Sequence, residues 1–200
     1  MINIGILVFD GVEELDFIGP YEMFAAAQDN APDVLDVKTY GFEKLDFVGN
    51  KRMQFTAHAF CRDAPKLDVL IVPGGNGSTV AAKQPGLVNW VKLQAAGCQW
   101  TTSVCTGARI LQAAGLIDGK RITTFHGAIA DFRKAGRARE VLDDVRYVQD
   151  GSLVTSAGVS AGIDMSLWLL GQIPSPAFAR EIQAYTEYFP APPYAADVGG

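Results

Sequence analysis

The segment QWTTSVCTG at residues 99–107 gives the clearest indication of the fold. Its apolar part, Gln99 to Val104, is typical of a buried strand, and residues 106–114 continue as a helix that stops at a glycine. A cysteine between such a strand and helix has the outline of a nucleophile elbow, G-x-S-x-G, with Ser103 at the first glycine and Cys105 at the serine. In this turn the nucleophile stands above the sheet beside the amino end of the helix, which favours a thiolate. We therefore expect Cys105 to be a nucleophile; the alternative is a buried cysteine that fills the junction.

Strands and helices alternate outward from this segment in both directions along the chain. Continuous apolar runs such as Ile2 to Phe9 are typical of strands buried on both faces, and the alternation predicts an α/β domain with a mostly parallel sheet. We expect the first helix to break at Gly19-Pro20, or to begin a fresh first turn at Pro20, because proline loses a backbone hydrogen bond. We also expect a type I′ hairpin at Asp150-Gly151. The expected strands are 2–9, 34–42, a short one near 47, 53–60, 68–72, 99–104, 121–124, 145–149 and 153–156, and the expected helices are 12–29, 85–96, 106–114, 128–135, 160–171 and 176–188.

Length and composition exclude several classes of protein. The chain has 200 residues, 48% of them hydrophobic and 20% charged, which is ample for a folded core. We expect one domain over 1–200, with an irregular proline-rich tail at 190–200. The net charge of −5 argues against nucleic-acid binding, and no apolar run is long enough for a membrane helix. Without a signal-peptide pattern at its start, the protein is expected in the cytoplasm.

The cysteines and histidines do not form a disulfide framework or a structural zinc motif. Three cysteines and two histidines are scattered along the chain without paired spacing. Cys61 and Cys98 lack the small flanking residues of Cys105, and we interpret them as structural.

Two glycines follow the strand at residues 68–72 and provide a second candidate feature. Gly74 and Gly75 leave backbone N–H groups uncovered by side chains, so they are candidate oxyanion donors together with the N–H of Thr106. The alternative is a tight turn with no role in binding. Because the ends of neighbouring parallel strands meet at one edge of a sheet, a neighbouring elbow strand would favour the first interpretation.

Acidic residues after the first strand provide a third feature. Glu13 and Glu14 are interpreted as complementing the helix dipole. Asp16 differs because its sequence neighbours, Leu15 and residues 17–18, are apolar. A carboxyl in apolar surroundings has a raised proton affinity and suits general acid catalysis beside a cysteine; the alternative is a plain helix cap.

His126 follows the expected strand 121–124 and is the fourth candidate. As a base it would complete a Cys–His pair. The alternative is a histidine that caps the next helix, and the two interpretations are left open.

With these motifs in place, the chain resembles the ThiJ/PfpI superfamily, which shares a flavodoxin-like sheet and nucleophile elbow with class I glutamine amidotransferases. Within it, the resemblance is greatest to isocyanide hydratases. Relatives that regulate transcription carry an additional helix-turn-helix domain, for which we expect no room before Gly200. The matching segments are 15–16 with 19–20, 71–75, 102–107, 113–116, 123–124, 158 with 161–164, and 187–188 with 190–193.

The resemblance implies a cofactor-independent and metal-independent hydratase. The Cys105 thiolate would attack the terminal carbon of an isocyanide, and Asp16 would hold the thiolate and protonate that carbon. Water would then hydrolyse the covalent thioimidate to an N-substituted formamide. The amides of Gly75 and Thr106 would orient the intermediate, and the Thr106 hydroxyl would assist the cysteine. The resemblance also implies a homodimer, and the apolar neighbours of Asp16 together with Val159 indicate a small apolar substrate.

One departure leaves other functions open. The resemblance places a histidine, followed by tryptophan, directly after the Thr-Thr pair, whereas this chain has Phe125, His126 and Gly127. We expect the pocket shape to differ there. The alternatives are a glyoxalase or deglycase acting on α-oxoaldehydes, and a cysteine-based redox sensor or stress protein without turnover.

Overall fold

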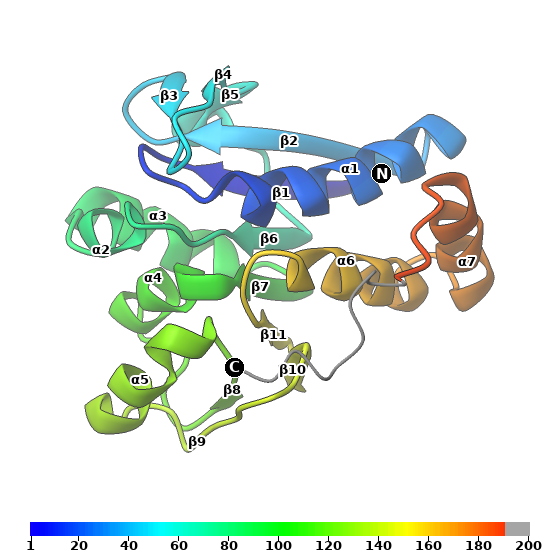
Figure 1. The fold of residues 1–200 in the computed structure, drawn as a ribbon. Coiled ribbons are helices and arrows are strands. Elements are labelled where there is room, and N and C mark those ends of the chain that lie inside the picture. Colours follow the sequence, from blue (N-terminus) through cyan, green and yellow to red (C-terminus); the bar gives the residue numbers. More distant parts are fainter. Residues whose placement is uncertain (191–200) are drawn as a thin grey trace.

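A seven-stranded sheet forms the centre of the protein (Figure 1), in a computed structural model that describes residues 1–190. Its strand order is β10-β11-β7-β6-β1-β2-β5, and every neighbouring pair is parallel except β10 with β11. The inner order β2-β1-β6-β7-β11 is that of flavodoxin-like folds, which confirms the predicted fold class. The strands are β1 (Ile2–Val8), β2 (Leu35–Gly41), β5 (Ala59–Phe60), β6 (Val69–Val72), β7 (Trp100–Val104), β10 (Tyr147–Asp150) and β11 (Leu153–Ser156).

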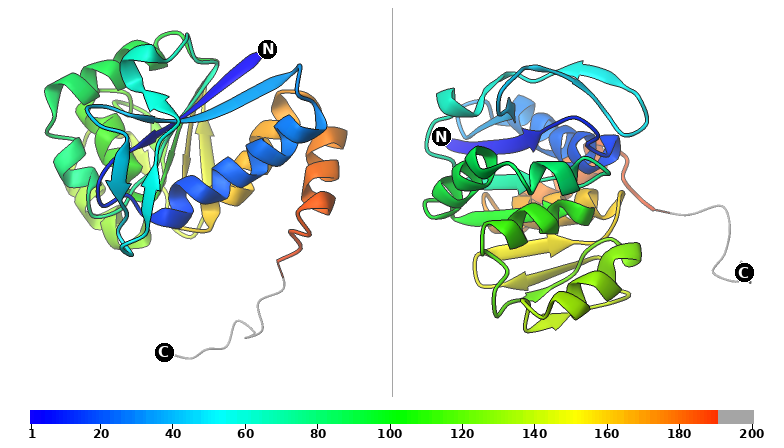
Figure 2. Two further views of the ribbon diagram at one scale, coloured as in Figure 1. Left: turned by 90° about the horizontal axis from the view of Figure 1, so that it is seen from above. Right: turned by 90° about the vertical axis from the view of Figure 1, so that its left-hand side faces the viewer.

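Helices cover both faces of this sheet (Figure 2). Helices α1 (Glu14–Asn30), α6 (Ala161–Gln172) and α7 (Pro176–Tyr185) pack together on one face. The opposite face carries α3 (Pro85–Ala95) and α4 (Ala108–Ala113), with α2 (Ser78–Ala81) against α4 and α5 (Ile129–Ala135) further along. No helix within residues 1–190 is both long and apolar enough to cross a membrane.

Short elements complete the fold at the ends of the main sheet. Strands β3 (Asp46–Val48) and β4 (Gln54–Thr56) form an antiparallel hairpin, and β8 (Arg121–Ile122) pairs in parallel with β9 (Glu140–Val141). Three single turns of 3-10 helix, η1 (Cys61–Asp63), η2 (Cys105–Gly107) and η3 (His126–Ala128), connect longer elements. The expected strand 53–60 is therefore split between two sheets, and the expected helix 106–114 begins as a 3-10 turn.

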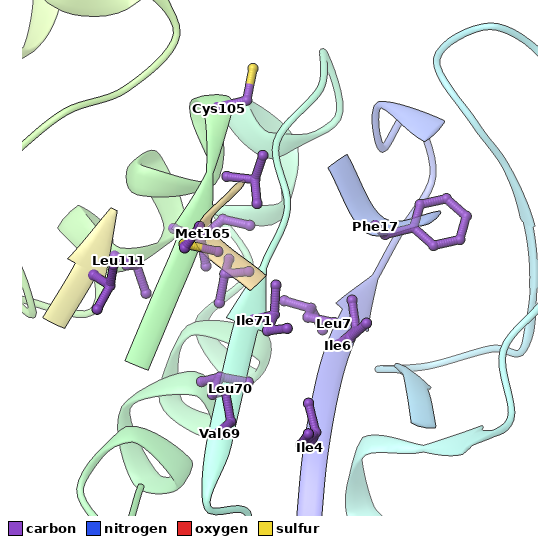
Figure 3. Close-up of a cluster of buried hydrophobic side chains, with 14 of the residues drawn as sticks. Ile4, Ile6, Leu7, Phe17, Val69, Leu70, Ile71, Cys105, Leu111 and Met165 are labelled. Carbon is purple, nitrogen blue, oxygen red and sulfur yellow. The ribbon is translucent and has the colours of Figure 1, made fainter. Parts of the chain in front are cut away.

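The apolar strand runs fill the core between the sheet and its helices (Figure 3). Ile4, Ile6 and Leu7 of β1 and Leu70 and Ile71 of β6 are almost completely inaccessible to water. Their register pairs Ile6 with Ile71, which aligns the two strands. Burial on both faces explains why these strands show continuous apolar runs rather than alternation, and it provides a rigid base for the loops at their carboxyl ends.

The predicted break at Gly19-Pro20 is wrong, because α1 is continuous and contains Pro20. Tight packing against α6 explains why the helix tolerates the proline. A Cβ on Gly162 would lie 3.2 Å from the Pro20 ring, and one on Gly19 would lie 2.9 Å from the Ile163 side chain. The close approach of the two helices offsets the lost backbone hydrogen bond.

The predicted turn at Asp150-Gly151 is displaced by one residue. Asp150 pairs with Leu153 in the antiparallel ladder, so Gly151 and Ser152 form the two-residue loop. Among the residues of this loop, only Gly151 has a positive φ, 66°. A type I′ turn requires positive φ at both positions, so the loop follows the II′ pattern with glycine first. The predicted proline-rich tail lies outside the described residues beyond Pro190.

Candidate active site

Cys105 lies directly after β7, at the edge of the sheet where the strands end. Its φ is 56°, in the left-handed region that costs a non-glycine residue about 1–3 kcal/mol. Two hydrogen bonds hold this conformation: the Cys105 N–H donates to the Ala157 carbonyl (3.0 Å), and the Thr124 hydroxyl donates to the Cys105 carbonyl (2.7 Å). Figure 3 shows the sulfur pointing away from the apolar cluster, beyond the strands. The sharp, strained turn matches the geometry of a nucleophile elbow.

Two glycines allow the elbow to pack against the end of β6. A Cβ on Gly107 would overlap the carbonyl of Val72, and a Cβ on Gly74 would overlap the backbone N–H of Thr106. Because β6 and β7 are neighbouring parallel strands, with Val72 paired to Ser103, the turns that follow them lie against one another. The predicted proximity of the Gly74 segment and the Cys105 elbow is therefore confirmed.

Asp16, near the start of α1, lies beside the Gly74 loop. Helix α1 follows β1, which is the neighbour of β6 on the side opposite β7. The residue is completely buried, and its Oδ2 accepts a hydrogen bond from the Gly74 N–H (2.9 Å). Its Oδ1 is buried without a hydrogen-bond partner of good geometry among the described residues. The Cys105 thiol and the Val159 N–H are close enough to lower the Asp16 pKa by hydrogen bonding. The unpaired oxygen thus has the thiol as an available donor.

Burial controls the proton affinities of this carboxyl and thiol. Loss of water raises the pKa of Asp16 from 3.8 to about 7, although the hydrogen bond from Gly74 opposes the rise. Burial, together with the charge of the Asp16 carboxylate, raises the pKa of the Cys105 thiol to about 12. The N–H groups of Thr106 and Val159 lower the Cys105 pKa, in the direction expected for the amino end of a helix, but burial has the larger effect. The thiolate stays a prediction.

The expected oxyanion donors are largely occupied within the protein. The Gly74 N–H donates to Asp16, and the Gly75 N–H donates to the Thr106 hydroxyl (3.0 Å). The Thr106 hydroxyl also accepts from the Ser78 hydroxyl (3.1 Å), which fixes the loop after β6 against the elbow. The N–H groups of Thr106 and Val159 face the sulfur instead, as their lowering of the Cys105 pKa indicates.

A cavity of about 350 Å³ opens above Cys105. Its wall is mostly polar, so the expectation of an apolar pocket is wrong. Asp16 has apolar sequence neighbours, but adjacent helix residues point in different directions: Phe17 packs on Phe55 with ring centroids 4.6 Å apart, and Leu15 is exposed. The wall consists of Glu13, Asn50, Lys51, Gly75, Asn76, Thr79, Cys105, Thr106, Arg109, Phe125, Gly127, Ala128 and Val159.

The sequence of this chain matches a known family of proteins. Residues 3–172 match the DJ-1/PfpI family. The chain belongs to the DJ-1/PfpI family. It is 37% identical over 193 residues to the isonitrile hydratase of Pseudomonas putida, a match that covers 96% of this chain and 81% of that protein.

Solved structures of the DJ-1/PfpI family share the fold. A ThiJ/PfpI family protein from Pseudomonas syringae superposes with a TM-score of 0.87 at 27% identity, covering 98% of this chain and 78% of the other. Drosophila melanogaster DJ-1beta superposes with a TM-score of 0.81 at 19% identity, over 93% and 97% of the two chains. The second likeness concerns the fold alone.

His126 does not reach the Cys105 cavity. Its side chain is exposed and lines a neighbouring hollow with Asp143 and Arg146, whereas Phe125 and Gly127 line the cavity itself. Val159 contributes to both walls. His126, which is shifted by one residue in the sequence, thus also lies in a different hollow. It does not pair with Cys105.

We expect His126→Ala to change kcat/KM for any substrate of this cavity by less than about twofold, since surface changes away from a site have small effects. Phe125→Ala removes part of the wall and should lower kcat/KM about tenfold or more. Steady-state kinetics of the two variants provide the measurement. A loss of kcat/KM in His126→Ala as large as that in Phe125→Ala would show that His126 belongs to the site.

Several polar residues of the wall were not predicted from the sequence. The Glu13 carboxylate accepts from the Asn50 side chain (2.6 Å) and pairs with Lys51 (3.0 Å). The Glu14 carboxylate accepts from the Lys51 N–H (2.7 Å). These contacts dock the tip of the β3–β4 hairpin onto the start of α1 and so complete the cavity. Glu13 therefore forms part of the cavity wall, in addition to the interaction with the helix dipole that was expected for it.

Residues that could hold a metal ion are absent from the described part of the chain. Within residues 1–190, no three His, Cys, Asp or Glu side chains are grouped closely enough to act as ligands.

The hydrogen bond from Thr124 to the Cys105 carbonyl allows a test of elbow strain. Thr124→Val should destabilise the protein by about 1–3 kcal/mol, because a buried carbonyl loses its donor, and should lower kcat about tenfold by releasing the cysteine. Thr123→Val is the matched control, since the Thr123 hydroxyl donates to Leu142 (2.9 Å) and not to the elbow. Urea unfolding and kcat are measured for both. Equal kcat in the two variants would contradict the positioning role of Thr124.

Proposed function

We propose that this protein hydrates isocyanides to N-substituted formamides through a covalent intermediate on Cys105. The observation that carries the proposal is the buried Asp16 carboxyl beside the strained Cys105 residue, whose thiol lines a cavity. The 37% identity to an isonitrile hydratase over 96% of the chain supports this reaction over others that use a cysteine. In this role the protein is a hydro-lyase.

In the first step the Asp16 carboxylate accepts the thiol proton as the sulfur attacks the terminal carbon of the isocyanide. The raised pKa of the buried Cys105 thiol and the lower pKa of the Asp16 carboxyl support a start with the proton on sulfur. Asp16 then gives this proton to the same carbon. One S–C bond and one C–H bond form, and the product is the thioimidate R–N=CH–S–Cys105.

In the second step water adds to the thioimidate carbon. The substrate nitrogen gains the second proton of this water, the water oxygen becomes the formyl oxygen, and the C–S bond breaks to release R–NH–CHO and the thiol of Cys105. Asp16 accepts a proton from the attacking water and returns it to the departing sulfur, so the enzyme is regenerated. The N–H groups of Thr106 and Val159 stabilise charge on the sulfur during both steps, and Gly74 fixes the Asp16 carboxyl through its N–H. Gly75 and the Thr106 hydroxyl maintain the loop that carries these groups.

This proton transfer gives the reaction a defined pH dependence. Asp16 must be ionised to accept the thiol proton, so kcat/KM should rise with pH through about 7, the raised pKa of Asp16. A pH–rate profile between 5 and 9 provides the measurement. A rate that falls through pH 7 would show that Asp16 must start protonated, as a general acid toward a preformed thiolate.

A second candidate is hydration of α-oxoaldehydes, as in glyoxalase-type members of the family. The polar wall of the cavity favours it, because a hydrophilic dicarbonyl is better accommodated there than in an apolar pocket. A redox sensor is less well supported, because Cys105 is buried, which limits the access of an oxidant to the sulfur.

The test is a steady-state assay of the purified protein with para-nitrophenyl isocyanide and, separately, methylglyoxal. We expect formamide production with kcat/KM above about 10³ M⁻¹s⁻¹, and slower consumption of methylglyoxal. Consumption of methylglyoxal without any formamide would replace the proposed reaction by the second candidate. No turnover of either compound would contradict both.

The family resemblance supports three further proposals about the state of the protein. We propose that it forms a homodimer and acts in the cytoplasm, without a resident cofactor or metal. Light scattering tests the first, with a mass near twice the 21.4 kDa of one chain expected.

A further inference from the structure

The wall of the Cys105 cavity carries one cation that residues 1–190 leave incompletely paired. Lys51 and Arg109 both line the cavity. The Lys51 ammonium is neutralised by Glu13, whose two carboxylate oxygens both lie 3.0 Å from it. Arg109 has no such partner on the cavity wall.

The contacts of Arg109 leave most of its hydrogen-bonding capacity free. One guanidinium nitrogen donates to the Thr79 hydroxyl (2.7 Å), which orients the group. The nearest carboxylate, Asp131, is 3.7 Å away, beyond hydrogen-bond distance, and its side chain is 76% exposed. Exposed pairs of this kind contribute little. A guanidinium has five N–H donors in a planar fork that matches a carboxylate.

Arg109 is also well placed relative to the reacting sulfur. It lies four residues after Cys105, in the first turn of α4, and both side chains line the same cavity. Asn76 and Thr79 line the same cavity and add polar groups to its wall. The cavity thus combines a nucleophile with a planar cation fixed at one side.

We propose that the Cys105 cavity selects substrates carrying an anionic group, a carboxylate above all, and that Arg109 binds this group. The inference rests on the proposed function for the reaction and adds the substrate class: isocyanides bearing a carboxylate close to the isocyano carbon. A neutral, apolar isocyanide offers no acceptor to the N–H groups of Arg109 that Thr79 leaves free, and lacks this attraction.

The test measures alkylation of Cys105 by iodoacetate and by iodoacetamide, which are similar in size and differ in charge. The two rates are followed by peptide mass spectrometry, and their ratio is divided by the same ratio for free cysteine. We expect a normalised ratio above one that falls about tenfold in Arg109→Met, the effect of losing one charged hydrogen bond. Arg109→Lys should retain part of it, and added salt should lower it.

Asp131→Asn is the matched control, because it removes the same inter-helix contact and leaves the guanidinium in place. It should keep the ratio at least as high as in the unmodified protein. An equal ratio in the unmodified protein and Arg109→Met would overturn the inference, as would a fall in Asp131→Asn equal to that in Arg109→Met.

The same variants are then assayed with isocyanoacetate and its methyl ester. The preference for the acid over the ester, expressed as a ratio of kcat/KM values, should fall about tenfold in Arg109→Met; an unchanged preference would count against Arg109. Absence of turnover with both compounds, combined with a charge-dependent alkylation ratio, would contradict the proposed reaction while supporting anion binding by Arg109.

Discussion

Replacing Cys105 by alanine should lower kcat by at least about 10⁴-fold, the scale seen when a covalent nucleophile is removed. The sulfur forms the bond to substrate in the proposed reaction, and no other thiol lines the cavity. The fold should persist, because alanine is smaller and keeps the backbone hydrogen bonds to Ala157 and Thr124. Formamide production and thermal unfolding of the variant are the measurements.

Cys98→Ala is the matched control for this experiment. Cys98 is half-buried, lies before β7 at the opposite end of the strand from Cys105, and does not line the cavity. It should retain activity within about twofold. Activity that survives in Cys105→Ala would exclude covalent catalysis at Cys105, and activity that disappears in Cys98→Ala would show that the loss is not specific to Cys105.

Asp16→Asn should remove activity and yet stabilise the protein at alkaline pH. The amide cannot accept and return a proton, so kcat should fall by about 10²–10⁴-fold. An asparagine carries no charge to bury, whereas the Asp16 carboxylate pays for burial once it ionises. Asp16→Asn should therefore lower kcat and raise the stability of the fold, and this combination distinguishes a catalytic role from a structural one.

The pH dependence of stability follows from the raised pKa of Asp16. In the unfolded chain Asp16 loses its proton near 3.8, but in the folded protein only near 7. The contribution of the protonated carboxyl to the free energy of unfolding is fully present below pH 3.8, and it is lost progressively as the pH rises to about 7. Asp16→Asn should therefore raise the free energy of unfolding by up to about 4 kcal/mol at pH 8, and change it little at pH 4.

Urea unfolding at pH 4 and pH 8 provides the measurement, with Glu22→Gln as control because Glu22 is exposed on the same helix. The control should behave as the unmodified protein at both values. A loss of stability in Asp16→Asn at pH 8 would show that the carboxylate is stabilised by its surroundings, and the assignment of a burial-raised pKa would be wrong.

The features predictable from the sequence were those governed by local rules. Three buried strands end before Asp16, Gly74 and Cys105, and parallel strands bring their carboxyl ends to one edge of the sheet. The three segments therefore meet as predicted. The helix break at Pro20 was wrong because packing against Gly162 of α6 is a tertiary effect that a local propensity does not contain.

The chemical character of the site depended on contacts that are distant in sequence. The polar wall comes partly from Asn50 and Lys51, which a hairpin carries to α1, and partly from Arg109. No local pattern marks such residues. The proton affinity of the Cys105 thiol depends on its burial as well as on the following helix, and burial is a tertiary property that the local sequence does not contain.

The most direct test of covalent catalysis by Cys105 is the mass of the protein during turnover. Rapid mixing with para-nitrophenyl isocyanide, followed by quenching and peptide mass spectrometry, should reveal an adduct on the peptide containing Cys105. We expect a mass increase equal to the whole isocyanide, because the thioimidate forms by addition without a leaving group. Formamide production with no adduct, or with an adduct at another residue, would contradict covalent catalysis by Cys105.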